Sequence, residues 1–277
     1  MKGITILLLS ILLTTGNLKA DTRLEKVFIV GVVPQFEARK LHSIWRPILN
    51  YLENETGYTF KLRGSPSIPE FEKQFIQGEF DFAYMNPYHL VIANDIAGYI
   101  PLVRDHGRQL FGVLVVKKDS GIKSPDELKG KKVAFPAPNA LAASMQIRQE
   151  LLDKFDTDVI PLYVKTHDSV YLSVLLGQSA AGGGVQKTLN QQSPENRDAL
   201  RVIHSTQKVT PHPFAALPSV PEDVRKAVIS AFMKLGDTES GRSMLRLIPI
   251  KKIGTASIQD YASLKKMGLE RFFVKTY

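Results

Sequence analysis

Short apolar runs alternate with amphipathic segments along the first hundred residues, and this alternation constrains the fold more than any other feature. The run Val27–Val33 is non-polar and mostly β-branched, which is typical of a strand buried on both faces. A helix is expected from the capping residue Ser43 to about Thr56, with Gly57 ending it. The predicted order is strand, helix, strand, helix, strand, helix, over residues 27–33, 43–56, 59–63, 68–77, 80–85 and 87–98. Such an order favours a parallel α/β sheet.

A second unit of the same kind follows. Strands are expected over 99–103 and 110–116, and strands and helices then alternate over 132–135, 142–155, 159–164, 169–176, 180–183, 186–190 and 201–205, with further helices at 221–235 and 257–269. The sequence therefore predicts an α/β protein of two lobes, each a mainly parallel sheet flanked by helices. Lobe 1 would contain residues 21–115 plus 206–277 and lobe 2 residues 116–205, with two hinge crossings near Val115 and Ser205. A ligand is expected in the cleft, at the carboxyl ends of the strands.

Residues 1–20 have the pattern of a cleavable secretory signal peptide. Lys2 supplies a positive charge, residues 4–13 are nearly all apolar, and Ala20 is a small residue before the expected cleavage point. The apolar run is shorter than the about 20 residues that cross a bilayer, so a retained membrane anchor is the less favoured alternative. The chain has no cysteine, which excludes disulfides and a lipid-modified cysteine. The expected location is the periplasm, where the remaining chain is long enough to bury its own core.

The charge of the chain is mildly basic. The formal net charge is +9, and it falls to about +7 without the expected signal peptide. Basic residues are scattered in pairs such as Lys117–Lys118 and Lys251–Lys252, with no stripe interleaved with aromatic residues, so no nucleic-acid partner is expected. Mild basicity aids solubility or attracts anions. No metal-ligand spacing such as His-x-x-x-His is present, and neither a metal nor a cofactor is expected.

The segment Phe135–Ser144 combines two conflicting properties. A short apolar strand runs into a turn punctuated by prolines, and a helix opens there. The first backbone N–H groups of a helix lack partners within it and carry the positive end of its dipole, so they form an anion-binding site. Asn139 and Ser144 are the only polar side chains that flank this opening turn, and Ser144 lies deeper along the helix. The backbone suits a polar ligand, whereas the side chains are unsuited to a phosphate.

Several segments occur in the order of a known family. They are Val32–Gln35, Asp81–Pro87, Asp119–Ile122, Asp126–Gly130, His167–Asp168 and Gly177–Gln178. Together they resemble the phosphate, phosphite and phosphonate periplasmic binding proteins of ABC importers, which have the two-lobed type 2 solute-binding fold. The resemblance covers nearly the whole chain after the expected signal peptide, and it is specific as a combination although each piece is weak.

The resemblance also implies ligand-binding positions. A tyrosine at the end of the third strand and a histidine in the Gly-Ser-His-Asp-like turn line the cleft in that family, and they match Tyr84 and His167. The central anion grip of the family is a Ser-Thr-Ser run at a helix start, and here that place holds Ala140–Ala142. A family acidic residue falls on Ala180. Both departures remove ligand-binding groups, so the chain resembles a divergent branch whose ligand is expected to be a small organic or weakly charged solute.

Each candidate position also has a purely structural reading. Asn86 precedes Pro87 and fits a helix cap as well as a ligand contact. Asp168 or Ser169 is expected to cap the helix that follows His167, and Tyr171 points either into the cleft or against the sheet. Gly183 lies in a triple glycine that permits close approach of a ligand or a tight turn. The predicted ligand-binding residues are Gln35, Tyr84, Asn86, Asn139, Ser144, His167, Asp168, Tyr171, Gly183 and His212.

Three functions are compatible with this sequence to different degrees. The leading hypothesis is a monomeric periplasmic protein that captures a small-molecule ligand by closure of its lobes and delivers it to an ABC permease. The alternative is a module that reports ligand to a membrane sensor kinase, and the sequence does not separate the two. A hydrolase is least favoured, because His167, Asp168 and Ser169 are neighbours on one turn and do not form a relay, and no Gly-x-Ser-x-Gly elbow is present.

Overall fold

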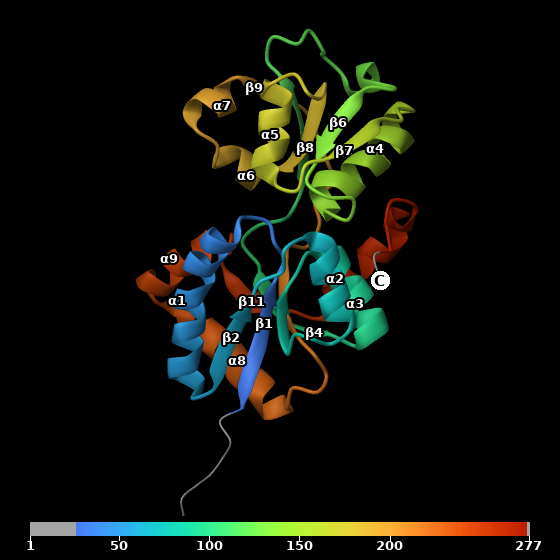
Figure 1. The fold of residues 1–277 in the computed structure, drawn as a ribbon. Helices are drawn as coiled ribbons and strands as arrows, with labels where there is room; N and C mark the ends of the chain where they lie inside the picture. Colours follow the sequence, from blue (N-terminus) through green and yellow to red (C-terminus); the bar gives the residue numbers. More distant parts are fainter. Residues whose placement is uncertain (1–25, 276–277) are drawn as a thin grey trace, which may run out of the picture.

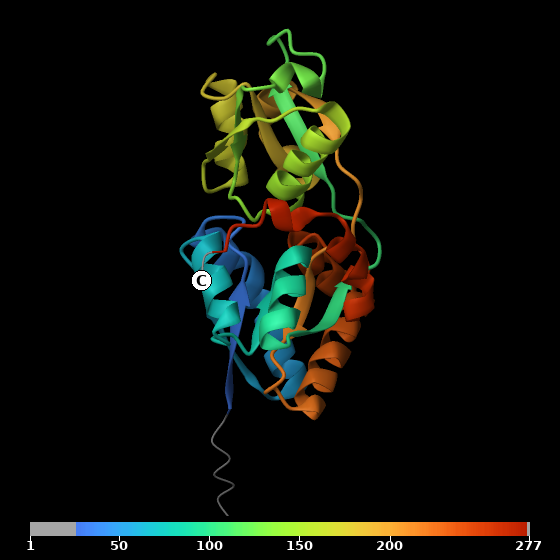
Figure 2. The ribbon, with the colours of Figure 1, turned by 90° about the vertical axis from the view of Figure 1, so that its right-hand side faces the viewer.

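The computed structural model describes residues 26–275, which form two lobes joined by two chain crossings (Figure 1). Each lobe is built around one β-sheet with helices packed against it, as Figures 1 and 2 show from two directions. The predicted α/β, two-lobed architecture is therefore confirmed. The expected signal peptide lies outside the described residues.

The sheet of the first lobe has six strands. Their order is β11-β4-β10-β3-β1-β2, with β1, β2 and β3 parallel and β10 antiparallel to both of its neighbours. The sheet is thus mixed rather than wholly parallel. The short strands β10 and β11 follow the last predicted strand, 201–205, and neither of them was predicted. The bounds are β1 Val27–Val32, β2 Thr59–Arg63, β3 Phe82–Tyr84, β4 Ile100–Asp105, β10 Pro213–Ala216 and β11 Ile253–Thr255.

The helices of the first lobe enclose an aromatic-rich core. Trp45 packs at 4.9 Å from Tyr84, measured between ring centroids, and Phe82 stacks on Phe214. The helix predicted from Ser43 begins five residues earlier, and the Ser43 hydroxyl donates to Lys40 O instead of capping. The bounds are α1 Ala38–Thr56, α2 Ile68–Ile76, α3 Pro87–Ala97, α8 Glu222–Asp237, α9 Glu239–Leu247 and the 3-10 segments η3 Ile258–Lys266 and η4 Leu269–Arg271.

The second lobe has a five-stranded mixed sheet in the order β7-β6-β8-β5-β9. Strand β5 is antiparallel to both neighbours, whereas β6 is parallel to β7 and β8. The strands are β5 Gly112–Lys117, β6 Lys132–Phe135, β7 Ile160–Tyr163, β8 Ala181–Val185 and β9 Leu200–Ser205. The helices are α4 Gln146–Phe155, α5 His167–Leu175, α6 Gln186–Asn190 and α7 Pro194–Asp198, with a 3-10 turn η1 Pro125–Leu128 and a π-helical turn η2 Leu141–Met145.

The chain passes between the lobes over residues 106–111 and 206–212. Val115 pairs with Gly182 of β8, so the crossing expected near it lies several residues earlier. Strand β9 pairs with β5 and ends at Ser205, and the second crossing begins there. The two crossings are bonded to each other, because Leu110 N donates to Val209 O at 2.9 Å and Val209 N donates to Leu110 O at 2.8 Å. They form a paired connection of the kind that hinge motions use.

Glycines on β5 and β8 bring the turn η2 close to the second sheet. A Cβ at Gly183 would lie 2.1 Å from Ala143 O, and one at Gly112 would lie 1.9 Å from Ala142 O. Any larger residue at either position would push the turn away from the sheet. The glycines therefore fix the depth at which the start of α4 sits, and the close approach at Gly183 is of backbone to backbone.

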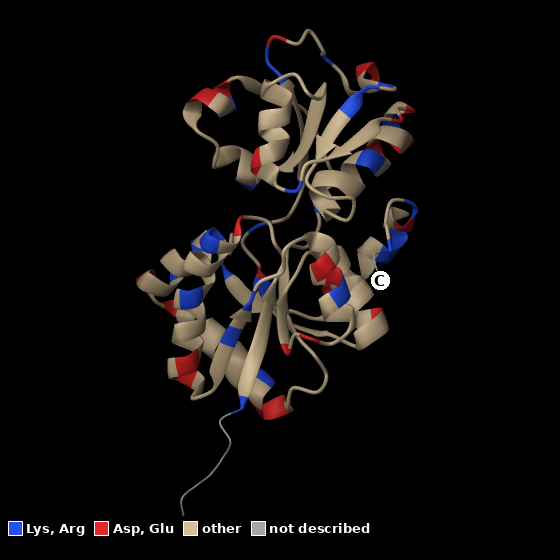
Figure 3. Cartoon of the chain, viewed as in Figure 1, with Lys and Arg blue, Asp and Glu red and all other residues tan. Residues whose placement is uncertain are grey.

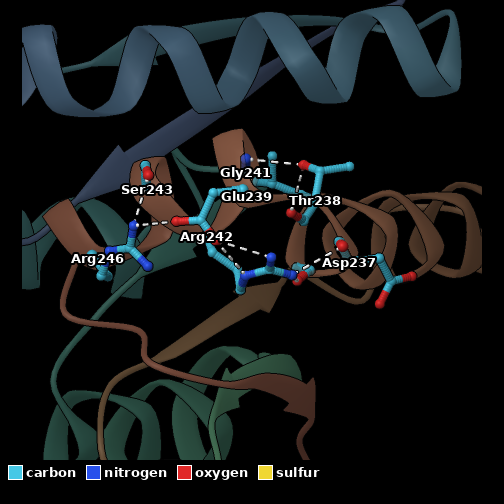
Figure 4. Close-up of polar contacts among 9 residues, drawn as sticks. Asp237, Thr238, Glu239, Gly241, Arg242, Ser243 and Arg246 are labelled. Carbon is cyan, nitrogen blue, oxygen red and sulfur yellow. Dashed lines mark hydrogen bonds and ion pairs between the residues drawn. The ribbon is translucent and has the colours of Figure 1, made fainter.

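A polar corner between α8 and α9 orients the last helix (Figure 4). Thr238 accepts a hydrogen bond from Gly241 N, and Arg242 donates to Asp237 O and to the carboxylate of Glu239. Arg246 reaches the other oxygen of Glu239. The carboxyl end of α9 then faces the second lobe, where Lys187 Nζ donates to Leu247 O at 2.9 Å.

Charged side chains of both signs are interspersed over the two lobes (Figure 3). Many of them form exposed ion pairs, such as Lys234 with Glu55 and Arg271 with Asp153. Within residues 26–275, no helix is both long and apolar enough to cross a membrane.

Candidate ligand-binding site between the lobes

A small cavity of about 30 Å³ lies where the two lobes meet. This is room for about one or two water molecules, so a compact chemical group fits there in this arrangement of the lobes. Its walls come from segments that follow the carboxyl ends of β1, β3, β6 and β7, as expected for an α/β fold. The lining residues are Val33, Pro34, Gln35, Ile68, Asn86, Leu110, Pro136, Ala140–Ala143, Lys165, His167, Val185 and His212.

The start of the helix formed by η2 and α4 supplies one wall. Ser144 N and Met145 N both pair with Ala140 O, at 2.8 and 3.2 Å, which marks the first turn as a wide one. The N–H groups at the beginning of such a helix have no acceptor within it and attract negative charge. The side chains here are methyl groups and a leucine, so this wall offers backbone donors and apolar surface but no hydroxyl.

His167 is the first residue of α5 and lies at the cavity with only 5% of its surface exposed. Its Nδ1 atom has no hydrogen-bond partner among the described residues. Burial lowers the pKa of His167 to about 4, although Asp168 opposes this shift. The ring is therefore neutral at neutral pH, with one nitrogen that donates and one that accepts.

A second histidine closes the opposite wall. Gln35 Nε2 donates to His212 Nε2 at 2.8 Å, which places the ring proton on Nδ1. Burial lowers the pKa of His212 to about 3, and the nearby His89, His167 and Lys187 act in the same direction. Both histidines of the cavity are therefore neutral at neutral pH and present hydrogen-bonding atoms rather than charge.

Tyr84 supports His212 instead of reaching the cavity. The two rings stack with centroids 5.4 Å apart and planes 24° apart. The Tyr84 hydroxyl donates to Ile248 O at 3.0 Å, and burial raises the pKa of Tyr84. Tyr84 thus positions His212 at the cavity, and it also lines the adjoining groove of about 320 Å³.

Asn86 is the cap of α3 and also lines the cavity. Its Oδ1 caps α3 by accepting from His89 N at 2.8 Å, and its Nδ2 donates across the lobe interface to Asn139 O at 3.2 Å. Asn139 points away from the cavity into a buried network. Its Nδ2 donates to Glu72 Oε2 at 2.9 Å and to Val274 O, while its Oδ1 accepts from Val274 N. Asn139 therefore ties the second lobe to the first lobe and to the C-terminal segment.

Besides Tyr84 and Asn139, four further predicted positions lie away from the cavity. Ser144 is fully buried one turn into the helix, as its spacing implied. Asp168 is exposed and accepts from Gln192 Nε2, and the Tyr171 hydroxyl bonds to Val185 O and Thr188 inside the second lobe. Gly183 faces Ala143 O and the Phe135 ring. Tertiary packing uses all four, so we do not propose them as ligand contacts.

Lys165 lines the cavity and was not predicted from the sequence. It is the one charged side chain of the cavity lining, and its backbone has a φ of 74°. A non-glycine residue in this left-handed region carries strain, which is common at ligand sites. Its position directly before the Thr166 cap and His167 was the available signal. Leu110, Pro136 and Val185 were missed as well, because apolar lining residues have no sequence signature.

Two larger grooves adjoin the cavity on either side. One has a volume of about 610 Å³ and shares Pro34, Ile68, Pro136 and Lys165 with the cavity. The other has about 320 Å³ and shares Gln35, Leu110, Val185 and His212. Together they form a continuous cleft between the lobes. Residues 26–275 contain no group of three His, Asp or Glu side chains arranged to hold a metal.

Solved structures share this two-lobed fold. A binding protein of an ABC phosphonate transporter from Pseudomonas aeruginosa matches 91% of this chain and 89% of its own, with a TM-score of 0.80 and 17% identity. The PhnD1 protein of Prochlorococcus marinus, solved with methylphosphonate, matches 89% of this chain and 98% of its own, with the same score and identity. The glutamate-binding core of GluR0 from Nostoc punctiforme, at 16% identity, covers 78% of this chain and 96% of its own with a TM-score of 0.56. These neighbours identify the fold as that of type 2 periplasmic binding proteins.

The sequence itself matches a protein family. Residues 30–261 fit the family described as ABC transporter, phosphonate, periplasmic substrate-binding protein. That span includes both lobes and every cavity residue, and the family is one of binding proteins rather than enzymes. The chain therefore belongs to the family of periplasmic substrate-binding proteins of ABC phosphonate transporters.

Proposed function

We propose that this protein captures a small organic solute in the cavity between its lobes and presents the closed form to an ABC permease. The observation that carries the proposal is the cavity itself, because both lobes and both crossings contribute to its walls. A ligand held by both lobes stabilises the closed arrangement by its differential affinity for it. The lobe boundaries are residues 106–111 and 206–212, where the chain passes between the sheets.

The lining favours a ligand with one compact polar group. Gln35, Asn86, His167 and His212 offer neutral hydrogen-bonding atoms, and Lys165 alone carries charge. A free inorganic phosphate at neutral pH would lack the hydroxyl donors that surround a tetrahedral dianion, since Ala140, Ala142 and Ala143 occupy the helix start. A singly charged or neutral polar group, attached to an organic body, matches the lining better.

A thermal-shift screen tests this proposal, since a ligand that binds the native state raises the melting temperature. The library contains inorganic phosphate, phosphite, methylphosphonate, sulfonates, carboxylates and amino acids. At least one organic solute is expected to stabilise the protein saturably, and His167→Ala is expected to weaken its binding at least tenfold. His106→Ala, outside the cavity, is the matched control. Equal binding by the His167 variant would place the ligand elsewhere.

We also propose that the protein acts as a monomer in the periplasm. Light scattering on the purified chain is expected to give a mass close to the 30.9 kDa of the full sequence or slightly less after removal of residues 1–20. N-terminal sequencing of protein recovered from the periplasm is expected to begin at Asp21. A mass of twice this value would contradict the monomer. An intact N-terminus would contradict the removal of residues 1–20.

A further inference from the structure

The last described residues of the chain, 268–275, lie against both lobes. This segment, called the strap below, follows η3 of the first lobe and contains η4. In Figure 2 it is red and runs along the boundary between the lobes toward the left, whereas the two crossings lie on the right. The strap therefore ends on the side remote from the crossings. A rotation about the crossings separates the lobes most on that side.

The strap is anchored on the first lobe by apolar contacts. The Leu269 side chain is fully buried in the main hydrophobic core, and Phe272 and Phe273 pack against the same core. The ring of Phe273 lies 5.6 Å from that of Tyr88 on α3, measured between ring centroids. Burial of this apolar surface holds the strap on the first lobe.

The strap reaches α4 of the second lobe through polar contacts. Arg271 Nη2 donates to both carboxylate oxygens of Asp153, at 2.9 and 3.1 Å. The Arg148 guanidinium lies 4.8 Å from the centre of the Phe272 ring. The side chains of Arg271 and Asp153 are 46% and 41% exposed, so water can replace their contact at small cost. These contacts with α4 are therefore easily broken and remade.

A further contact joins the strap to the turn that precedes η2 and α4. Val274 O accepts from Asn139 Nδ2 at 2.8 Å, and Val274 N donates to Asn139 Oδ1 at 2.8 Å. Asn139 is buried, whereas Val274 is exposed. Asn139 directly precedes Ala140, which lines the cavity. The strap thus ties one wall of the cavity to a segment of the first lobe.

We propose that the strap is a releasable latch that favours the closed arrangement of the lobes independently of any ligand. Its apolar side stays on the first lobe, and its polar contacts part from the second lobe when the lobes open. Because exposed ion pairs and cation–π contacts contribute little individually, the strap biases the equilibrium between open and closed forms without locking it. The inference concerns the lobes alone, so it can fail while the proposed function stands.

Labelling of a cysteine in the cavity measures the open population, since the chain has no cysteine of its own. Ala140→Cys, the cavity probe, places a thiol on the cavity wall. An aromatic disulfide reagent is too bulky for a cavity of about 30 Å³, so its rate follows the open fraction when opening is fast. Ala231→Cys, the core probe, lies on α8 within the first lobe and is buried, so opening of the lobes leaves it covered.

Reversing the charge of Arg271 tests the ion pair. Arg271→Glu places a second carboxylate beside Asp153 and is expected to speed labelling of the cavity probe about threefold, without changing the core probe. Adding Asp153→Arg restores the pair with opposite polarity and is expected to return the rate toward that of the parent protein. Lys265→Glu is the matched control, because Lys265 pairs with Asp95 inside the first lobe and those side chains are 50% and 48% exposed. It is expected to leave both probes unchanged.

Val274→Pro tests the contact with Asn139. It removes the N–H that donates to Asn139 Oδ1 and leaves a buried acceptor unpaired, so the cavity probe is expected to react at least about fivefold faster. Faster reaction of the cavity probe alone, in both this variant and Arg271→Glu, would support the latch. An unchanged cavity probe in both variants, or equal acceleration of the cavity and core probes, would overturn it.

Discussion

At the scale of single residues, two buried histidines make stability depend on pH. The folded pKa values of His167 and His212 are about 4 and about 3, well below the usual value of 6.5. Between pH 6.5 and 4 the unfolded chain therefore binds more protons than the native protein, so stability falls as the pH is lowered. We expect each histidine to cost on the order of 2 kcal/mol by pH 4.5.

Urea unfolding of the ligand-free protein at pH 7, 6 and 5 measures this effect. The wild type is expected to lose stability across this range, and His167→Asn is expected to lose less because its contribution to proton uptake is gone. The comparison concerns the slope with pH, so a constant offset between the proteins is irrelevant. Identical slopes would show that His167 titrates normally.

Gly183 gives a second prediction at the residue scale. A Cβ at this position would lie 2.1 Å from Ala143 O and 2.6 Å from the Phe135 ring. Gly183→Ala is expected to lower the free energy of unfolding by about 1–3 kcal/mol, because the turn η2 has to move off the sheet. Gly64→Ala is the control, since a Cβ there meets nothing within 4 Å. Similar unfolding midpoints for the two variants would contradict the tight packing.

At the scale of elements, Asn139 joins the turn before α4 to α2 and to the C-terminal segment. Its contact with Glu72 is buried, whereas another contact between that segment and the second lobe, the ion pair of Arg271 with Asp153, is 46% and 41% exposed at its two side chains. Removing one partner of a buried polar contact costs about 1–3 kcal/mol, and exposed ion pairs contribute about 0–1 kcal/mol. Asn139→Ala is therefore expected to destabilise the protein clearly more than Asp153→Ala in urea titrations. The reverse ranking would contradict the network.

At the scale of the whole molecule, the same network holds the lobes together. The chain contains no cysteine, so cysteines introduced at the exposed positions Asn50 and Leu176, one on each lobe, accept a dye pair without interference. In this labelled protein Asn139→Ala is expected to lower the efficiency of energy transfer, because loss of the contacts to Glu72 and Val274 favours opening. A ligand found in the screen is expected to raise it again. Unchanged transfer in the variant would show that Asn139 does not govern closure.

Helices and strands were predictable where the sequence contains a local cap or a periodic pattern. Asn86 followed by Pro87 marks the start of α3, and the side chain of Asn86 caps it as expected. The predicted start of α1 was wrong because Ser43 is a residue type that often caps helices. In the structure the helix already begins at Ala38, and Pro47 lies in its interior. Strands β10 and β11 were not predicted, since three or four residues without alternation give no periodic signal and their pairing to β3 and β4 is wholly non-local.

The candidate site was predictable only in part for the same reason. Gln35, Asn86, His167 and His212 follow or precede strand ends, and the structure places all four on the cavity. Tyr84 also ends a strand, but its ring stacks on the His212 ring and its hydroxyl donates to the Ile248 carbonyl. Tyr171 carries the same polar tip, and its partners lie within its own lobe. No local pattern reports which partner a side chain meets.

The sequence by itself determined a two-lobed α/β fold, because strand and helix periodicity and turn chemistry are local properties of the chain, and its resemblance to a known family implied the role of a binding protein. It also determined that the helix start at Ala140–Ala143 lacks hydroxyls. Only the tertiary structure decided that this start faces a small cavity with Lys165 and His167, that Asn139 is hydrogen-bonded to Glu72 of the first lobe, and that a groove continues from the cavity. These features arise from contacts between segments up to 177 residues apart, whose geometry exists only once both lobes have folded and closed.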